Sequence, residues 1–111
     1  MRWLRKRRAM HLLIDGQGPC PKDVRKFLME ACRWLDMVLV LSPFIFTDIQ
    51  EHIRAVTMGV EGHVFLHHRH PESFFIDFFS FKPFDSGDIT AKTINYLQFT
   101  SHISQVLRRE S

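Results

Sequence analysis

The segment from residue 55 to residue 81 most constrains how this 111-residue chain can fold. It contains three runs rich in β-branched and aromatic residues, at 55–61, 63–69 and 73–81. The runs are separated by one and three residues, and such tight connections are typical of β-hairpins. The sequence therefore predicts consecutive antiparallel strands in the middle of the chain.

The regions on either side of this segment predict two helices and three further strands. A strand at 9–15 ends in a Gly- and Pro-rich turn, after which Pro21 can open a helix over 22–35. A strand follows at 37–46, where Pro43 indicates an edge position or a bulge. The residues that define the buried face of the first helix are Val24, Phe27, Leu28, Ala31, Cys32 and Leu35.

The C-terminal part predicts a second helix and a short last strand. Asp88 can cap a helix over 89–99, with one apolar side made of Ala91, Ile94, Tyr96 and Leu97. Ile103, Val106 and Leu107 then suggest a strand. Helices between strands, with hairpins in the middle, favour an α+β fold: a two-layer sandwich whose mainly antiparallel sheet carries both helices on one face.

Composition places this fold in a single domain at 9–111, preceded by a basic tail at 1–8. A hydrophobic content of 45% and a charged content of 24% fit a folded protein. No apolar run reaches the roughly 20 residues that span a bilayer, and the start is too short and polar for a signal peptide. Cys20 and Cys32 are too few for a disulfide scaffold, so reduced thiols and a cytoplasmic location are expected.

The net charge of +3 is concentrated at the N-terminus. Five of the fifteen basic residues lie between positions 2 and 8, which leaves ten basic and twelve acidic residues in the domain. Such a tail can attract nucleic acid or anionic lipid, but it is more often simply solvated. The sequence therefore predicts neither a membrane nor a nucleic-acid partner for the domain.

Residues 61–67 read Glu-Gly-His-Val-Phe-Leu-His and are followed by Pro71 and Glu72. This pattern resembles the self-processing segment of the pyruvoyl-type bacterial and archaeal S-adenosylmethionine decarboxylases, enzymes of polyamine biosynthesis, which reads Glu-Ser-His-Ile-Ser-Ile-His before Pro-Glu. Residues 10–15 are similar to the family's opening strand, and 75–81 to its Ala-Val-Asp-Val-Phe-Thr-Cys. The resemblance implies the same two-layer sandwich.

Three positions that hold processing or catalytic residues in the family hold other residues in this chain. The family's Ser becomes a pyruvoyl group, the electron sink for decarboxylation, and Gly62 stands there without an attacking oxygen. Arg54 stands where a processing Ser is expected, and Phe81 stands at the proton-donating Cys, whereas the family's His is retained as His67. The resemblance therefore implies a divergent member with no pyruvoyl cofactor, no functional catalytic residue and no decarboxylation of its own.

The resemblance also suggests a ligand. Glu72 corresponds to the family's Glu that binds ribose hydroxyls, since a carboxylate can accept from both hydroxyls of a diol. With Phe65 and His67 it would bind S-adenosylmethionine or a related nucleoside. A solvated turn carboxylate at Glu72 is an equally good interpretation, because one residue is inserted just before Pro71.

Two further local patterns are weaker indications of a functional site. His63, His67, His68 and His70 form a histidine cluster, but in a strand His63 and His67 lie about 13 Å apart on one face, too far to share an ion. No metal site is therefore expected. Residues 101–104 read Ser-His-Ile-Ser, a copy of the processing sequence, but they fall in the last expected strand without a following Pro-Glu.

Aromatic residues on both faces of the 73–81 strand predict burial on both sides, under the helices and at a second surface. We therefore expect a homodimer or a heterodimer with a homologue. The role suggested is that of a nucleoside binder or of a regulatory partner of an active homologue. Two alternatives stay open: a divergent active decarboxylase or other enzyme on the same scaffold, and an RNA-binding sheet module, although 74–81 lacks the Gly and basic residues of an RNA-binding strand.

Overall fold

The computed structural model describes residues 8–110. The tail predicted at 1–8 lies outside the described residues except for Arg8, at which the first strand begins. Among the described residues, no helix is long and apolar enough to cross a membrane. The elements follow in the order β1 (Arg8–Gln17), α2 (Val24–Trp34), β2 (Leu39–Thr47), β3 (Ile53–Gly59), β4 (Gly62–Arg69), β5 (Ser73–Ser80), α3 (Ser86–Leu97) and β6 (Ser101–Glu110).

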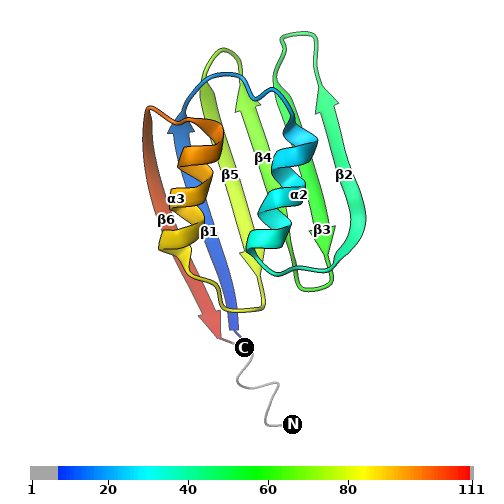
Figure 1. The fold of residues 1–111 in the computed structure, drawn as a ribbon, viewed down its shortest axis with the longest axis vertical. Helices are drawn as coiled ribbons and strands as arrows, with labels where there is room; N and C mark the ends of the chain where they lie inside the picture. Colours follow the sequence, from blue (N-terminus) through cyan, green and yellow to red (C-terminus); the bar gives the residue numbers. More distant parts are fainter. Residues whose placement is uncertain (1–7, 111) are drawn as a thin grey trace.

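The six strands form one sheet in the order β2-β3-β4-β5-β1-β6, and every neighbouring pair is antiparallel. The hairpins predicted between residues 55 and 81 are confirmed as β3, β4 and β5. The last strand is longer than predicted, because β6 pairs with β1 over the whole length of β1, from Arg8 to Gln17. β1 therefore lies inside the sheet, between β5 and β6 (Figure 1).

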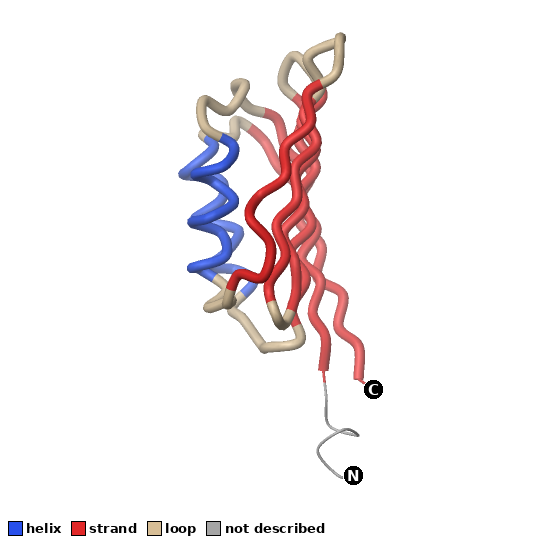
Figure 2. Tube along the Cα trace, turned by 90° about the vertical axis from the view of Figure 1, so that its right-hand side faces the viewer, coloured by secondary structure: helices blue, strands red, loops and turns tan. Residues whose placement is uncertain are grey.

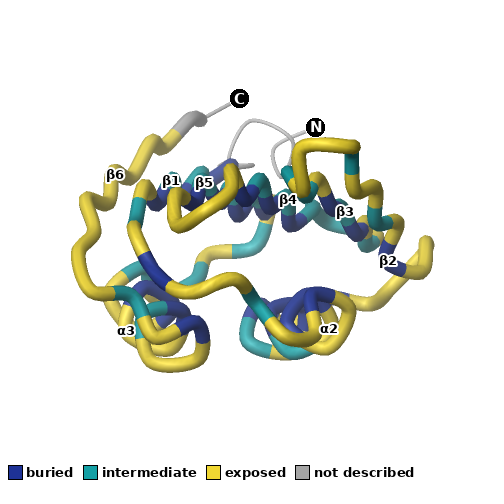
Figure 3. Tube along the Cα trace, turned by 90° about the horizontal axis from the view of Figure 1, so that it is seen from above, coloured by how far each residue is buried: buried dark blue, intermediate teal, exposed yellow. Residues whose placement is uncertain are grey.

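Both helices cover one face of the sheet, as the sequence predicts, and the other face carries no helix (Figure 2). The most deeply buried positions lie between the helices and the sheet (Figure 3). This core is built from alternate residues of the strands, such as Leu12, Ile14, Leu66 and Phe78, packed against the apolar faces of α2 and α3.

The first helix presents the predicted apolar face but begins later than predicted. Val24, Phe27, Leu28, Ala31 and Cys32 are all buried. The helix begins at Val24 rather than beside Pro21, because the Asp23 side chain accepts a hydrogen bond from the Lys26 N–H at 3.0 Å. An Asp side chain that accepts from a free first-turn N–H is among the preferred helix caps.

The second helix differs from its prediction in both its cap and its buried face. The cap is Asp85, whose side chain accepts a hydrogen bond from the Asp88 N–H at 3.0 Å, so Asp88 lies inside the first turn. The buried side consists of Ile89, Thr90, Thr93 and Leu97, whereas Ala91 and Tyr96 are exposed. Threonine can be buried here because the hydroxyl of Thr93 donates to the Ile89 carbonyl at 2.8 Å within the helix.

The edge strand β2 contains the predicted irregularity. Its register against β3 shifts between Leu41 and Phe44, around Pro43. The hydroxyl of Thr57 donates to the Leu41 carbonyl at 3.0 Å across this shift. Proline has no N–H to donate. In an edge strand this position can face solvent, so the sheet loses no hydrogen bond between strands.

The predicted burial of β5 under the helices is confirmed, whereas its burial at a second surface stays a prediction. Phe74, Ile76 and Phe78 face the helices and are buried, whereas Phe75 and Phe79 point to the opposite side and are half-buried. The described residues form two helices, and both lie on the same side of the sheet. No element within residues 8–110 therefore covers the second face.

One titratable group lies in the core between the helices and the sheet. The side chain of His68 is fully buried against Phe74, with ring centroids 4.5 Å apart. Neither ring nitrogen of His68 has a hydrogen-bond partner among the described residues. Burial lowers the pKa of His68, and the positive charge of His70 acts in the same direction; the Pro71 carbonyl opposes both.

We predict that replacing His68 with Leu reduces the loss of stability on acidification. Because its pKa is lowered in the folded state, the unfolded state binds the extra proton more readily. The wild-type free energy of unfolding therefore falls as the pH drops below the unfolded value of about 6.5, by at most about 1.4 kcal/mol per pH unit for one proton. Chemical denaturation between pH 5 and pH 7 measures the difference, with the exposed His102→Leu as control. Equal pH slopes in His68→Leu and the wild-type chain would contradict it.

Candidate functional site

The sheet face opposite the helices, called the open face below, carries the candidate site. Cross-strand neighbours in an antiparallel sheet share a face, so the strand register defines three rows of side chains that cross all six strands. The first row is Leu41, Met58, His63, Phe79, His11 and Leu107; the second is Phe44, Val56, Phe65, Asp77, Leu13 and Gln105; the third is Phe46, Arg54, His67, Phe75, Asp15 and Ile103. Most of these side chains are apolar, and several are well exposed, including Phe44 at 63% and Ile103 at 75%.

Two imidazoles share one carboxylate near the middle of the open face. His11 Nδ1 lies 3.1 Å from Asp77 Oδ1, and His63 Nε2 lies 3.3 Å from Asp77 Oδ2. With Asp77 ionised, each carboxylate oxygen accepts a hydrogen bond from one ring N–H. Asp77 thereby orients both rings and leaves each with one further nitrogen.

The two histidines keep Asp77 ionised. Burial alone would raise the pKa of Asp77, but the hydrogen bonds from His63 and His11, together with their positive charge, lower it below its ordinary value of 3.8. The cluster can therefore hold a negative charge in a half-buried place. It contains no electrophile.

Aromatic rings surround the two histidines. Phe79 stacks on the His63 ring with centroids 5.3 Å apart and lies against the His11 ring at 4.5 Å. Phe81 meets Phe79 edge to face at 5.0 Å. The cluster is thus a polar centre inside an aromatic surface, a composition that suits binding of a flat or apolar group.

Gly62 and Phe81, two of the three substituted positions, lie close together. Gly62 pairs with Ser80 across β4 and β5, and the Phe81 N–H donates to the Glu61 carbonyl at 2.8 Å. A Cβ at position 62 would overlap the Phe79 carbonyl oxygen and would lie 2.9 Å from the Ser80 Cα. Both neighbours are backbone atoms of the paired strand, so no side chain fits at position 62 unless β4 and β5 move apart.

Arg54 and His67 form a second group at the other end of β4. They are cross-strand partners, about 16 Å along the strand from Gly62. Burial lowers the pKa of His67, and the charges of Arg54 and Arg69 lower it further, so the ring is neutral at pH 7. His67 Nε2 is buried and has no hydrogen-bond partner among the described residues.

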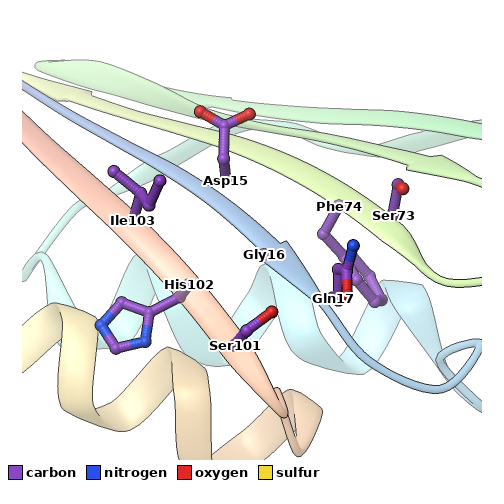
Figure 4. Close-up of a pocket in the computed structure, with 8 residues that line it drawn as sticks. All are labelled: Asp15, Gly16, Gln17, Ser73, Phe74, Ser101, His102 and Ile103. Carbon is purple, nitrogen blue, oxygen red and sulfur yellow. The ribbon is translucent and has the colours of Figure 1, made fainter.

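A hollow of about 360 Å³ lies beside this second group, lined by Asp15, His67, Arg69, Ser73, Phe74 and Phe75. It adjoins a second hollow of about 340 Å³ at the ends of β1, β5 and β6, with which it shares Asp15, Ser73 and Phe74 (Figure 4). Figure 4 shows the carboxylate of Asp15 directed away from His102. The two hollows together offer a carboxylate, an aromatic ring and a neutral imidazole within one area.

The structure brings together only part of the predicted ligand set. Phe65 and His67 lie two residues apart on the open face, as alternation in a strand predicts. Glu72 lies in the exposed turn between β4 and β5, where its carbonyl accepts from the Gly18 N–H at 2.8 Å. Glu72 lines neither hollow, whereas Asp15 lines both.

The histidine cluster predicted at 63–70 separates in space. His63 and His67 face the open side, and His68 is buried on the helix side. No group of three or more His, Cys, Asp or Glu residues that could hold a metal ion occurs among residues 8–110. The Ser-His-Ile-Ser copy at 101–104 lies at the start of β6, as expected.

Sequence reasoning missed the contact between His11 and Asp77. Both residues belong to segments that resemble the decarboxylases, but they are 66 positions apart in the chain. Only the pairing of β1 with β5 places His11 beside Asp77. This contact could be predicted only if the position of β1 inside the sheet, beside β5, were known. The alternation of residues within β1 does not reveal that position.

The comparisons with known proteins support the fold. No protein-family model matches the sequence, and no curated protein matches it. Among solved structures, the chain is similar to the adenosylmethionine decarboxylase from Aquifex aeolicus VF5, with a TM-score of 0.78 and 18% sequence identity. The match covers 96% of this chain and 93% of that one. The protein has an S-adenosylmethionine decarboxylase-like fold.

We predict that Asp77→Asn destabilises the chain at pH 7 by about 1–3 kcal/mol, the usual range for losing charge-assisted hydrogen bonds. Since the pKa of Asp77 is lowered on folding, its stabilising effect is complete above the unfolded value of about 3.9. The effect is lost as the pH falls through the lower folded-state pKa. The difference between wild type and variant should therefore shrink below about pH 4.

Urea denaturation at several pH values measures this difference. Glu72→Gln is a suitable control, because it removes an exposed carboxylate for which no hydrogen bond or ion pair is found in the described part of the chain. A destabilisation by Asp77→Asn that is no larger than that by Glu72→Gln at pH 7 would show that the two imidazoles contribute nothing to stability.

Proposed function

We propose that this protein is a non-cleaving relative of the S-adenosylmethionine decarboxylases that acts by binding through its open face. The observation that carries the proposal is the close approach of β5 backbone to Gly62. A pyruvoyl group requires a serine at that place, and here the chain has neither a side-chain oxygen nor room for one. The chain thus has the scaffold and an aromatic surface but lacks the electrophile.

Two further substitutions support the same role. Arg54 supplies a permanent charge where the resemblance implies a hydroxyl, and this charge adds to burial in lowering the pKa of its neighbour His67. Phe81 packs edge to face on Phe79 and has no proton to deliver. Residues that would serve cleavage and decarboxylation have been replaced by residues that shape a surface.

The wild-type chain is expected to stay uncleaved. The Gly62→Ser variant is expected to stay uncleaved as well and to be less stable than the wild type. The added side chain must displace paired backbone, which should cost about 1–3 kcal/mol, as overpacking usually does. Intact-mass measurement and thermal denaturation of both proteins check the two expectations. Gly87→Ser is a matched control, because a Cβ there meets only the Asp85 side chain at 3.4 Å.

The opposite result is equally clear. Two fragments that separate before residue 62 in the wild-type chain, or a mass loss consistent with a pyruvoyl terminus, would overturn the proposal. Cleavage of Gly62→Ser alone would show that the rest of the processing machinery is intact.

A second candidate function is binding of S-adenosylmethionine or a related nucleoside in the hollow beside His67. The observation that favours it is the buried, unpartnered Nε2 of His67, in a hollow that also contains Asp15 and the ring of Phe75. Asp15 can accept both hydroxyls of a ribose, and Phe75 can stack on a base.

For this candidate we expect S-adenosylmethionine to raise the melting temperature, with a gain of about 2.7 kcal/mol at a ligand concentration of 100 Kd. Asp15→Asn should abolish most of the shift, whereas Glu72→Ala should leave it unchanged. Differential scanning fluorimetry with all three proteins measures both effects. Loss of the shift in Glu72→Ala alone would instead support the assignment made from the sequence, and no shift in the wild-type chain would exclude this candidate.

A further inference from the structure

Two arginines lie at the hollow beside His67. Arg69 lines this hollow, and Arg54 is the cross-strand partner of His67. Arg69 is two residues from His67 on the same face of β4, so the backbones of the two arginines are about 8 Å apart. Two long side chains at this spacing can converge on one group of a ligand.

Neither arginine is engaged within the fold. No hydrogen bond or ion pair of the Arg54 or Arg69 side chain is found among the described residues. Asp48, in the turn before β3, instead accepts from the backbone N–H groups of Gln50 and His52 at 2.9 and 3.0 Å. Both guanidinium groups can therefore donate to another molecule.

His67 indicates the sign of the electrostatic potential at the hollow. Burial lowers the pKa of His67, and the charges of Arg54 and Arg69 lower it further. His52 acts in the same direction, whereas Asp48 opposes them. Because neighbouring cations disfavour a protonated ring, the lowered pKa indicates a positive potential at this wall. Such a potential attracts anions and repels cations.

The other side of the same area carries a carboxylate. Asp15 is on β1, two strands away from β4, so its backbone is about 12 Å from that of Arg69. Its side chain and that of Ile103 point to one side of the sheet, whereas the ring of Phe74 points to the other (Figure 4). Asp15 is exposed, and its side chain has no hydrogen bond or ion pair within residues 8–110.

The hollows are large enough for a small molecule that spans these groups. Their volumes of about 360 and 340 Å³ both exceed the roughly 300 Å³ at which ligand pockets begin. In the third row, Phe75 lies between His67 and Asp15, so an aromatic ring forms the floor between the cationic end and the carboxylate. This order suits a ligand with an anion at one end and hydroxyl groups at the other.

We propose that this end of the open face binds a phosphorylated ribose, with the phosphate between Arg54 and Arg69 and the ribose hydroxyls on Asp15. The inference rests on the proposed binding role of the open face and names the chemical class of its ligand. A guanidinium group matches the geometry of phosphate oxygens and can donate two parallel hydrogen bonds to them. A carboxylate accepts from both hydroxyls of a diol.

The charges distinguish this ligand from S-adenosylmethionine. That molecule carries a sulfonium and an ammonium cation against one carboxylate, and the two arginines repel both cations. A phosphate monoester instead carries a charge of about −1.5 to −2 at pH 7. Arg54 stands where the resemblance implies an uncharged Ser, so this preference belongs to the present chain. Among nucleosides, the charges therefore favour a phosphate over a sulfonium group on the ribose.

Isothermal titration calorimetry of the wild-type chain with five probes tests the proposal. The probes are adenosine monophosphate, ribose 5-phosphate, adenosine, inorganic phosphate and S-adenosylmethionine. We expect the first two to bind at least about tenfold more tightly than the other three, since only they offer both a phosphate and a free diol beside it. Equal affinities of the first two would assign the ligand as a free sugar phosphate, and tighter binding of adenosine monophosphate would assign it as a nucleotide.

Single variants locate the site. Arg54→Gln and Arg69→Gln should each weaken binding of adenosine monophosphate about tenfold to a hundredfold, the effect of losing charge-assisted hydrogen bonds. Asp15→Asn should weaken binding of both sugar phosphates. Arg33→Gln is the matched control, because it removes the same charge from the exposed side of α2 and should leave binding unchanged. All three site residues are exposed, so the variants should melt at the wild-type temperature, which thermal denaturation checks.

Nuclear magnetic resonance of the His67 ring gives a second readout. A phosphate bound beside this ring favours its protonated form. The pKa of His67 should therefore rise when adenosine monophosphate is bound, and it should not rise with adenosine. Binding at a distant surface would leave this pKa unchanged and would contradict the proposed site.

Several results would overturn the proposal. These are no binding of either sugar phosphate, equal or tighter binding of adenosine, inorganic phosphate or S-adenosylmethionine, and variants of Arg54 and Arg69 that bind as well as the wild type. Intact mass is measured on the same samples. An uncleaved chain that binds no sugar phosphate would refute this ligand without refuting the non-cleaving function, whereas a cleaved chain would refute that function whatever it binds.

Discussion

The register between β4 and β5 is the constraint on which the rest of the site depends. Because Gly62 pairs with Ser80, the backbone of β5 occupies the space that a side chain at position 62 would need. The same register brings His63 onto Phe79 and beside Asp77. A shift by one residue would move all these side chains to the helix side. The helix-side core and the open face thus specify the same alignment.

The two faces of the sheet differ in how far their apolar side chains are covered. The helix-covered face buries apolar side chains in a single core and tolerates one unpartnered polar ring, that of His68, because that ring can remain neutral. The open face also carries aromatic and aliphatic groups, but no helix or strand of the described residues covers it. Hydrophobic burial therefore stabilises the fold from one side, while the other side retains apolar surface on which an interaction can be built.

Charge is distributed over the open face according to burial. In the half-buried centre, Asp77 is hydrogen-bonded to two imidazoles, since an isolated carboxylate there would be costly. Farther out, Arg54 and Asp15 are exposed, and no ion pair of either side chain is found among residues 8–110. His67, next to Arg54, is held neutral by burial and by that charge. The open face thus joins an apolar area to a few charged side chains.

Local sequence determined the parts of the structure that depend on neighbouring residues. Alternation in the hairpins, the apolar spacing of the first helix and the motif around Gly62 predicted the two-layer fold. The helix starts at Asp23 and Asp85 were missed, since several residues near each start could have capped it. The position of β1 inside the sheet was decided only in three dimensions, and with it came the contact of His11 with Asp77 and the place of Asp15 opposite Arg54 about the sheet midline. Pairing between strands far apart in sequence depends on how the whole sheet buries its core, and no local pattern encodes that choice.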